Sequence, residues 1–397
     1  MRNFFKILIL VLPFGLIGCE NNKSTSITIT NPLNSDRLHE TIELNPNDFQ
    51  ALIDQYGYDK LAIFDQKENK LLVNQWMDTN GDGKNDVWLF QTNIQSMETL
   101  RFNIRPLNDG EQQPTSTLMT YSRFVPERTD DYAWENDRVA FRTYGPDAQR
   151  RVEQKLPQGT LTSGIDAWLK KVDYPIINKW YSKYVAKTGS YHKDTGEGYD
   201  PYHVGISRGI GGIGFWNSDT LFCSKNFSSY KKIAEGPIRT MFELNYEKWF
   251  IDGDSVAEKK IISLDLGSNL CHFQSHFTSD QPLPPTVIGI TLHNKKGESN
   301  LNIKQGYFSY WEKIDQHMLG TGIVINPHVI SDARRHEVDK KDLSHLYVIT
   351  QPNQKIVDYY AGFGWEGSQQ FQSKEEWNSY LNDFAIKTKH PLQVTVE

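Results

Sequence analysis

Short segments in which apolar and polar residues alternate recur along the chain, and turn-forming residues separate them. Residues 26–30 (Ser-Ile-Thr-Ile-Thr) and 40–44 (Glu-Thr-Ile-Glu-Leu) show this alternation clearly. A period of two places one face of a strand in the core and the other in solvent. Because the sequence has no repeat of about 20 to 50 residues, solenoids and propellers are disfavoured. We therefore expect a mainly β fold, a large antiparallel β-sandwich of the supersandwich type with few short helices. Further strand candidates are residues 61–64, 71–73, 99–104, 138–143, 238–244, 260–265, 286–292 and 321–325.

The C-terminal region carries the clearest helix signal. Residues 373–376 (Ser-Lys-Glu-Glu) have the form of a capping box, in which a serine and a glutamate satisfy the first free N–H groups of a helix. Trp377, Tyr380, Leu381 and Phe384 follow at spacings of three and four residues, so they form one apolar stripe. We interpret this stripe as core packing rather than as a cofactor site.

Two other segments are less regular. Residues 163–184 are expected to hold short helical turns that Pro175 interrupts. Residues 328–347 are charged and irregular, which predicts a surface loop. No stretch has the composition of an interdomain linker, so residues 26–397 are predicted to form a single catalytic β-sandwich domain.

Residues 1–18 are predicted to be a lipoprotein signal peptide. They begin with basic residues and continue with an apolar run that is too short to span a bilayer as a helix. Residues 16–19 (Leu-Ile-Gly-Cys) resemble the bacterial lipobox, in which the cysteine is lipidated and becomes the mature N-terminus. We therefore expect Cys19 to carry lipid, residues 19–25 to form a tether, and the protein to be anchored in the bacterial cell envelope, facing the periplasm or the cell surface. The alternative is an ordinary signal peptide with an incidental cysteine.

The net charge of −6 provides no basic face for nucleic acid, so no nucleic-acid partner is expected. The N-terminal lipid is the only membrane contact that the sequence predicts. Once Cys19 is assigned to lipid, Cys223 and Cys271 remain. An exported compartment permits a disulfide between them, and two buried thiols are an equally good interpretation.

An acidic loop at residues 78–86 matches the first part of a calcium-binding EF-hand loop. Gly83 at its sixth position permits the sharp turn that an oxygen cage needs. The twelfth position is Leu89 rather than a bidentate glutamate, and the flanking segments are predicted strands. A hairpin-borne structural Ca²⁺ site and a solvated Asx-rich turn without an ion both fit this pattern. The candidate ligands are Asp78, Asn80, Asp82, the carbonyl of Lys84, and Asp86.

A glycine-rich stretch at residues 180–216 carries most of the groups that can move protons. Glycine in such numbers marks backbone that bends sharply or approaches another group closely. His192 follows Tyr191, and both imidazole and phenol can act as acid–base groups. Arg208 stands among glycines where backbone and ligand can come close. The alternative for His192 and for His203 is a structural role through hydrogen bonds.

A second cluster lies at residues 131–146, where strand geometry places Arg138 and Arg142 on one face. A planar guanidinium suits the bidentate binding of a carboxylate or a sulfate. The alternative is an ordinary ion-pair network with Glu135 and Asp137.

Several motifs of the chain together support a family resemblance. They are W-E-N-D-R, R-x-Y-G-P, G-I-D-x-W, Y-H-x-D-x-G-E-G-x-D-x-Y-x-V-G, G-x-G-G and G-P-I-R, together with the D-x-N-x-D-G-x-x-D pattern of the acidic loop. With them the chain resembles, over residues 26–390, a family of bacterial lipoproteins and secreted proteins found beside polysaccharide-degrading enzymes. The family was long described only as a domain of unknown function, and it is similar to the ulvan oligosaccharide dehydratases of marine bacteria.

The resemblance implies an oligosaccharide dehydratase, a carbon–oxygen lyase. Such an enzyme removes water from the non-reducing-end glucuronic or iduronic acid of a sulfated, rhamnose-containing oligosaccharide and leaves an unsaturated uronate. The implied partner is thus an acidic sulfated oligosaccharide, and the chemistry requires no cofactor. Two other interpretations stay open: a polysaccharide lyase, which would expel a sugar rather than water, and a glycan-binding surface lipoprotein without catalysis.

Water elimination needs a base for the C5 proton, a cation for the carboxylate and an acid for the leaving C4 hydroxyl. On chemical grounds we assign His192 as the base, Tyr191 or Tyr202 as the acid, and Arg208 as the cation. If residues 191–192 lie on a regular strand, their side chains point to opposite faces, which favours Tyr202. The predicted substrate-binding residues are Trp134, Glu135, Asp137, Arg142 and His203.

Overall fold

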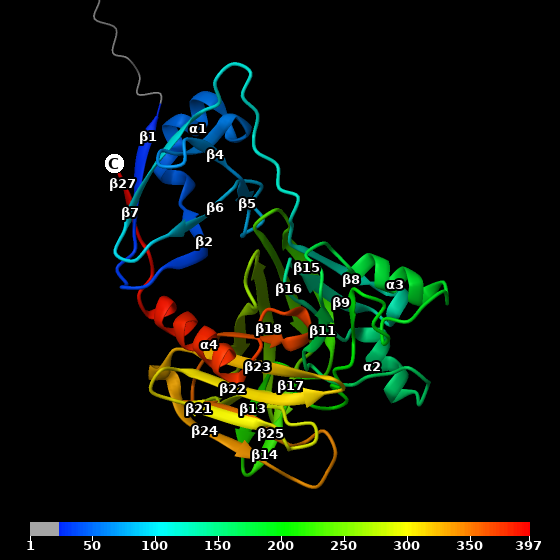
Figure 1. The fold of residues 1–397 in the computed structure, drawn as a ribbon. Helices are drawn as coiled ribbons and strands as arrows, with labels where there is room; N and C mark the ends of the chain where they lie inside the picture. The colour runs from blue at the N-terminus through cyan, green and yellow to red at the C-terminus, as the bar shows by residue number, and fades with distance from the viewer. Residues whose placement is uncertain (1–23) are drawn as a thin grey trace, which may run out of the picture.

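The computed structural model describes residues 24–397, and over this range the fold is mainly β, as predicted (Figure 1). The predicted signal peptide, Cys19 and most of the predicted tether lie outside the described residues. In the described part of the chain, no helix is long and apolar enough to cross a membrane. The α-helices are α1 (Gln50–Tyr56), α2 (Pro146–Glu153), α3 (Ile177–Val185) and α4 (Lys374–Lys389).

Strands β1 to β7 and the C-terminal β27 form a small two-sheet sandwich, which we call the N-terminal module (Figure 1). Its sheets have the strand orders β27-β1-β7-β3-β4 and β2-β6-β5. The predicted alternation of residues 26–30 is confirmed, because Ile27 and Ile29 are fully buried in the module core beside Trp88 and Phe102. The strands are β1 (Thr25–Thr30), β2 (Arg37–Leu44), β3 (Leu61–Asp65), β4 (Lys70–Leu72), β5 (Asn74–Met77), β6 (Val87–Ile94), β7 (Thr99–Pro106) and β27 (Gln393–Val396).

A nine-stranded antiparallel sheet forms the centre of the rest of the molecule. Its order is β15-β16-β18-β19-β26-β23-β22-β21, and β17 pairs with β18. In β16 the side chains of Phe242 and Leu244 are buried, whereas Met241 and Glu243 are only partly covered, so this strand shows the predicted alternation. The strands are β15 (Phe227–Ala234), β16 (Arg239–Tyr246), β17 (Trp249–Ile251), β18 (Asp254–Asp265), β19 (Leu270–Thr278), β21 (Glu298–Asn302), β22 (Tyr307–Ile314), β23 (His317–Ile325) and β26 (Ile356–Trp365).

Two five-stranded sheets cover one face of the nine-stranded sheet. One has the order β12-β11-β10-β9-β8 and the other β14-β13-β20-β25-β24. Residues from all three sheets meet in one buried cluster that includes Phe141, Ile288 and Phe273, so the predicted β-sandwich is confirmed. The strands are β8 (Tyr121–Val125), β9 (Asp131–Glu135), β10 (Ala140–Thr143), β11 (Asp166–Lys170), β12 (Gly198–Tyr199), β13 (Ile210–Asn217), β14 (Thr220–Phe222), β20 (Thr286–Thr291), β24 (Ile330–His336) and β25 (His345–Thr350).

Helix α4 packs on the opposite face of the nine-stranded sheet, as its apolar stripe predicts. Its capping serine, Ser373, accepts a hydrogen bond from the Glu376 N–H at 3.2 Å. Trp377 is fully buried against β23, where Gly320 permits the close approach. A Cβ at Gly320 would lie 2.5 Å from the Trp377 ring. The helix therefore depends on a glycine in the strand beneath it as much as on its own stripe.

Two local predictions need correction. Residues 328–347 are not a loop throughout, since β24 and the start of β25 lie within them. β24 is an edge strand with mostly half-exposed side chains, so its sequence lacks a buried alternating face. Residues 163–184 hold a strand, β11, before a regular helix, α3, that begins after Pro175. The outer face of β11 is buried under α3, which removes the alternation that would have identified the strand.

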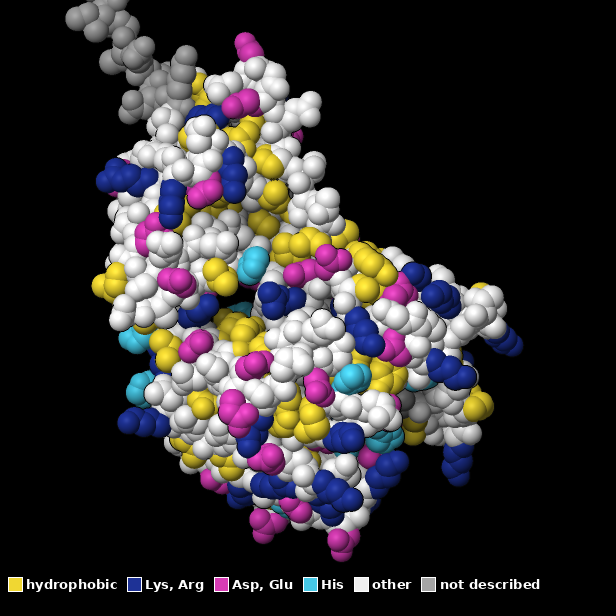
Figure 2. Space-filling model, viewed as in Figure 1, with side chains coloured by type: hydrophobic (Ala, Val, Ile, Leu, Met, Phe, Trp, Pro, Cys, Tyr) yellow, Lys and Arg dark blue, Asp and Glu magenta, His cyan; other side chains and the backbone are white. Residues whose placement is uncertain are grey.

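The cores of the N-terminal module and of the large sandwich are separate clusters of buried residues. The prediction that residues 26–397 act as a single domain therefore stays a prediction. Figure 2 shows that the visible face is hollowed between the two parts.

Candidate active site

The outer face of the β8–β12 sheet, which is turned away from the large core, carries the predicted site residue Arg142, and the predicted site residue Tyr191 packs against this face. Strand alternation in β10 and β11 directs Arg142 and Asp166 to this face, where they are cross-strand partners. Helix α3 covers it, and the Trp168 ring lies 4.9 Å from the ring of Tyr191 and 4.8 Å from that of Tyr181. The site is thus held between a sheet and a helix.

Three buried carboxyl groups surround the buried guanidinium of Arg142. Its Nε donates to Asp166 Oδ2 at 2.7 Å, and its Nη2 donates to Asp200 Oδ2 at 3.0 Å. Asp131 Oδ2 lies 3.6 Å from Nη1. All four side chains are at most 6% exposed. We call Arg142 and these three residues the Arg142 cluster.

Burial raises the pKa of the carboxyl groups in the Arg142 cluster. It raises the pKa of Asp131 to about 6, although Arg142 and Arg128 act in the opposite direction. Burial, reinforced by the charge of Asp166, raises the pKa of Asp200 well above its usual range. Burial therefore disfavours the charged form of Asp200, and the hydrogen bond from Arg142 opposes this only in part. Within the described residues, Asp131 Oδ1 and Asp200 Oδ1 have no hydrogen-bond partner.

Tyr191 and His192 lie side by side next to this cluster. Residues 190–193 form a turn, in which the Lys193 N–H donates to the carbonyl of Ser190 at 3.3 Å. A regular strand would have sent the two side chains to opposite faces, whereas the turn leaves their ring centroids 4.5 Å apart. The preference for Tyr202 over Tyr191 as the acid therefore loses its geometric basis.

The backbone of Asp200 fixes the orientation of the His192 ring. His192 Nδ1 lies 2.9 Å from the carbonyl oxygen of Asp200 and 3.6 Å from its Oδ2. A carbonyl only accepts, so Nδ1 carries the hydrogen and Nε2 of the neutral ring keeps a free lone pair. The side chain is 52% exposed, and within the described residues Nε2 makes no hydrogen bond. Imidazole in this state can accept a proton from a ligand at the surface.

Arg128 is a site residue that sequence reasoning missed. Its Nε donates to the hydroxyl of Tyr191 at 3.1 Å, and Arg142 Nη1 donates to the same oxygen at 3.3 Å. Its Nη1 donates to Thr129, while Nη2 makes no hydrogen bond within the described residues. Arg128 is half-buried and contacts the hydroxyl of Tyr191, the residue before His192, so the cluster holds a second cation. Only its place just before the 131–146 segment could have signalled it.

Comparison with known proteins places the chain in a family without an assigned function. The family model described as "Domain of unknown function (DUF4861)" matches residues 29–394. The chain belongs to this family. Over 386 residues it is 43% identical to "Uncharacterized protein P7" of Formosa agariphila, covering 97% of this chain and 96% of that protein.

Solved structures resemble this DUF4861 chain in fold. A glycosyl hydrolase family 38 protein from Enterococcus faecalis matches with a TM-score of 0.53 at 9% identity, and an α-mannosidase from the same organism matches with a TM-score of 0.48 at 8% identity. Each match covers 95% of this chain but only 48% and 46% of the respective solved chain. The chain therefore spans less than half the length of these proteins, and the likeness concerns the fold alone.

Two predicted catalytic residues of the DUF4861 chain lie outside the Arg142 cluster. Arg208 is buried, and its guanidinium donates to Thr162 Oγ1 at 2.8 Å and to Ser163 Oγ at 3.0 Å. Tyr202 is buried beside the ring of His293 at a centroid distance of 4.6 Å. The structure does not bring either of them into contact with His192.

The predicted substrate-binding residues other than Arg142 are also dispersed. Trp134 is fully buried and donates to Cys271 Sγ at 3.1 Å. Glu135 is fully buried and paired with a lysine. Asp137 accepts from the Gly267 N–H at 2.7 Å. His203 is 51% exposed and lies 3.2 Å from Asp342.

Of the two interpretations of the remaining cysteines, the structure shows free thiols, since Cys223 and Cys271 form no disulfide.

The acidic loop uses its side-chain oxygens for its own backbone. Asp78 accepts from the N–H groups of Gly81 at 2.6 Å and Gly83 at 2.8 Å, and the Gly83 bond lowers the pKa of Asp78. Asn80 and Asp82 accept from the N–H two residues ahead, and Asp86 accepts from Thr79. The carbonyl of Lys84 is a further candidate oxygen of this loop. Among residues 24–397 no group of three or more His, Cys, Asp or Glu side chains is placed to hold a metal ion. The calcium site stays a prediction.

Proposed function

We propose that the chain removes water from the non-reducing-end uronic acid of ulvan-type sulfated oligosaccharides. The observation that carries this proposal is the environment of His192, whose Nδ1 is bound to the Asp200 carbonyl, whose side chain is 52% exposed and whose Nε2 makes no hydrogen bond within the described residues. The family resemblance over residues 26–390 supplies the substrate class. We base the proposed location at the cell envelope on the lipobox at Cys19, which lies outside the described residues.

In the proposed reaction, His192 Nε2 takes the C5 proton of the uronate. The electron pair of the C5–H bond forms the C4–C5 double bond, and the C4–O bond breaks. The leaving hydroxyl departs as water with a proton from Tyr191. The Tyr191 oxygen already receives hydrogen bonds from Arg128 and Arg142, so two cations face the negative charge that the transfer leaves there.

Arg128 replaces Arg208 as the proposed cation for the substrate carboxylate. C5 loses its proton readily only when negative charge on the neighbouring carboxylate is neutralised. Within the described residues the Nη2 of Arg128 makes no hydrogen bond, and its Nε donates to Tyr191, the residue before His192, whereas both terminal nitrogens of Arg208 are bound to buried hydroxyls. A guanidinium suits this role because it binds a carboxylate with two N–H groups.

The test is mass spectrometry of ulvan oligosaccharides that carry a saturated uronic acid at the non-reducing end, incubated with the purified soluble part of the chain. We expect loss of one water at unchanged chain length, together with new ultraviolet absorbance. Shorter unsaturated products would instead identify a polysaccharide lyase. Saturable binding without any change in mass would identify a glycan-binding lipoprotein.

His317 provides a matched control for His192. Both imidazoles are partly exposed, at 52% and 41%, and both lie near a carboxylate. We expect His192→Ala to lower turnover about 10²–10⁴-fold, the usual contribution of a general base, and His317→Ala to keep it. Equal turnover of the two variants would remove His192 from the proposal.

A further inference from the structure

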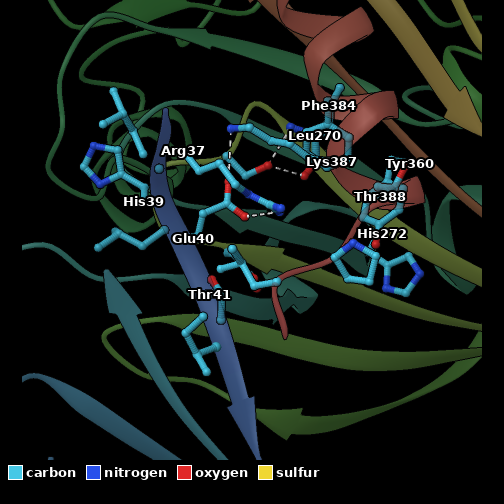
Figure 3. A pocket seen from close by; sticks show the side chains of 18 of the residues that line it. Arg37, His39, Glu40, Thr41, Leu270, His272, Tyr360, Phe384, Lys387 and Thr388 are labelled. Atoms are coloured by element: carbon cyan, nitrogen blue, oxygen red, sulfur yellow. Dashed lines mark hydrogen bonds and ion pairs between the residues drawn. The ribbon is translucent and has the colours of Figure 1, made fainter. Parts of the chain in front are cut away.

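A cleft of about 550 Å³ lies between the N-terminal module and the large sandwich, and it shares no residue with the Arg142 cluster. Strand β2 forms one wall and the last turns of α4 form the other. The floor is the outer face of the nine-stranded sheet, where Leu270, His272 and Tyr360 point out of β19 and β26 (Figure 3). The volume lies within the range of about 300–1,000 Å³ that small-ligand sites occupy.

Aromatic rings line the floor and one wall of the cleft. The His272 ring stacks on Tyr360 at a centroid distance of 4.5 Å and an interplanar angle of 16°. Phe384 of α4 contacts the same tyrosine edge-on at 4.9 Å. Each of these side chains is only partly covered, so the cleft offers ring surface to a ligand. Such surface suits flat molecules with C–H groups on one side.

The charged groups at the β2 wall are already paired with one another (Figure 3). Glu40 accepts from Arg37 Nη2 at 2.8 Å, and its other oxygen lies 3.0 Å from Lys387 Nζ. Arg37 Nη1 donates to the carbonyl of His390 at 2.8 Å. The carboxylate thus joins β2 to the end of α4.

A second set of pairs lies on the sheet side of the cleft. Arg239 forms hydrogen bonds with Glu43 at 2.6 Å and with Asp265 at 2.5 and 2.8 Å. The Lys and Arg residues that line the cleft thus equal its Asp and Glu residues in number, so these side chains carry no net charge. The three cations are Arg37, Arg239 and Lys387, and the three carboxylates are Glu40, Glu43 and Asp265. An anionic ligand would have to compete with these carboxylates for every cation, and a cationic ligand would meet the same difficulty with the cations.

We infer that this cleft binds a short stretch of uncharged sugar units. A pyranose has an apolar C–H face for the rings and hydroxyl groups that both donate and accept. Such hydroxyls can bond to an existing ion pair without breaking it. Leu38, Leu392 and the aliphatic part of Lys387 supply the remaining apolar contact. The inference does not rest on the proposed reaction at His192.

The test measures binding of cellotetraose, mannotetraose and xylotetraose to the soluble chain by isothermal titration calorimetry and saturation-transfer NMR. Tetragalacturonate is the charged comparison. We expect saturable binding of at least one neutral probe, and at least tenfold weaker binding of tetragalacturonate. Failure of all three neutral probes, or tighter binding of the charged one, would overturn the inference.

Variants assign the binding to the cleft. Tyr360→Ala removes ring surface, and Thr388→Trp fills the space from the α4 wall, which keeps the test informative if the first variant fails to fold. Each should weaken binding of the neutral probe at least tenfold. Phe250→Ala is the control because Phe250 is 62% exposed on β17, outside the cleft, and should leave binding unchanged. Equal binding by the control and the cleft variants would overturn the assignment. His192→Ala should retain binding, which separates this site from the proposed reaction.

Discussion

The two ends of one sheet face carry buried charge in opposite ways. At one end of the outer face of the β8–β12 sheet, Lys170 Nζ donates to Glu135 and to the carbonyls of Asn136 and Tyr174 at 2.8–2.9 Å. Both oxygens of Glu135 are also bonded to the first N–H groups at α3, those of Ile176 and Ile177, at 2.9 Å. One cation meets one anion there, and every donor and acceptor is used.

At the other end, Arg142 meets three carboxyl groups and two carboxyl oxygens have no partner within the described residues. The first arrangement holds a helix against a sheet. In the second arrangement, burial and, to a smaller extent, the neighbouring carboxyl groups raise the pKa values of Asp131 and Asp200, and groups with perturbed pKa values gather at functional sites. A buried ion pair is therefore informative about function mainly when its charges do not balance.

We expect the largest loss of stability at the end where Lys170 and Glu135 balance each other, when the lysine is removed. Lys170→Met leaves Glu135 as a buried charge, which we expect to lower the free energy of unfolding by about 3–5 kcal/mol in urea denaturation. Lys183→Met is the control, since Lys183 is 42% exposed and its Nζ lies 3.8 Å from the carboxylate of Glu197. The effect of this substitution on the free energy of unfolding should stay within about 0.5 kcal/mol. A loss below about 1 kcal/mol for Lys170→Met would show that Glu135 takes up a proton instead.

The Arg142 cluster, where carboxyl groups outnumber Arg142, should make the stability of the protein depend on pH. Burial raises the pKa of Asp131 from 3.8 to about 6. The folded protein therefore binds this proton more tightly than the unfolded chain, and stability falls as pH rises from about 4 to about 6. A difference of about two pKa units corresponds to about 3 kcal/mol. Asp131→Asn keeps an acceptor for Tyr181 and should remove this loss, as urea denaturation between pH 4 and 7 would show. A variant that loses stability with pH as steeply as the wild type would contradict the assignment.

Substitutions of Arg128 and Arg208 distinguish a residue needed for the proposed reaction from one needed for stability. Arg128→Gln should lower kcat/KM about 100-fold, the usual cost of one charge-stabilising donor, and change the free energy of unfolding by less than about 1 kcal/mol. Arg208→Gln should instead lower stability and leave activity unchanged. It removes the charged donor from the buried hydroxyls of Thr162 and Ser163, which keep only the Gly164 N–H and the Ser224 hydroxyl as donors, and it should cost about 1–3 kcal/mol. Steady-state kinetics and urea denaturation on both variants decide the matter. If Arg208→Gln lost activity while keeping stability, the sequence-based assignment would be restored.

Local patterns predicted much of the fold. The alternation of Ile27 and Ile29 and the Ser373 cap identified β1 and α4 because each signal lies within a few neighbouring residues. Strand β11 was not predicted, because a helix covers its outer face and both faces are buried, which removes the alternation. Edge strand β24 was not predicted for the opposite reason, because neither of its faces is well buried.

The candidate site could be predicted only in part. His192, Tyr191 and Arg142 were found because their side-chain chemistry is specific. Asp131, Asp166, Asp200 and Arg128 reach the site from β9, β11 and two loops, and only the pairing of strands brings them together. Arg208 looked suitable because glycines surround it in sequence. In the structure those glycines let the backbone pack tightly, and a Cβ at Gly212 would lie 2.4 Å from the carbonyl oxygen of Arg208. The glycine pattern thus marked close packing at this position.

The acidic loop extends the comparison to the surface and gives the smallest expected effect. Like Glu135, Asp78 uses both carboxylate oxygens for backbone N–H groups, those of Gly81 and Gly83, but in solvent. Asp78→Ala should therefore lower the melting temperature only slightly, because water replaces the lost hydrogen bonds. Thermal denaturation with calcium and with a chelator separates the two interpretations of the loop. If calcium stabilises the wild type but not the variant, the loop holds an ion. If the cost of the variant is the same in both conditions, the oxygens serve the turn alone.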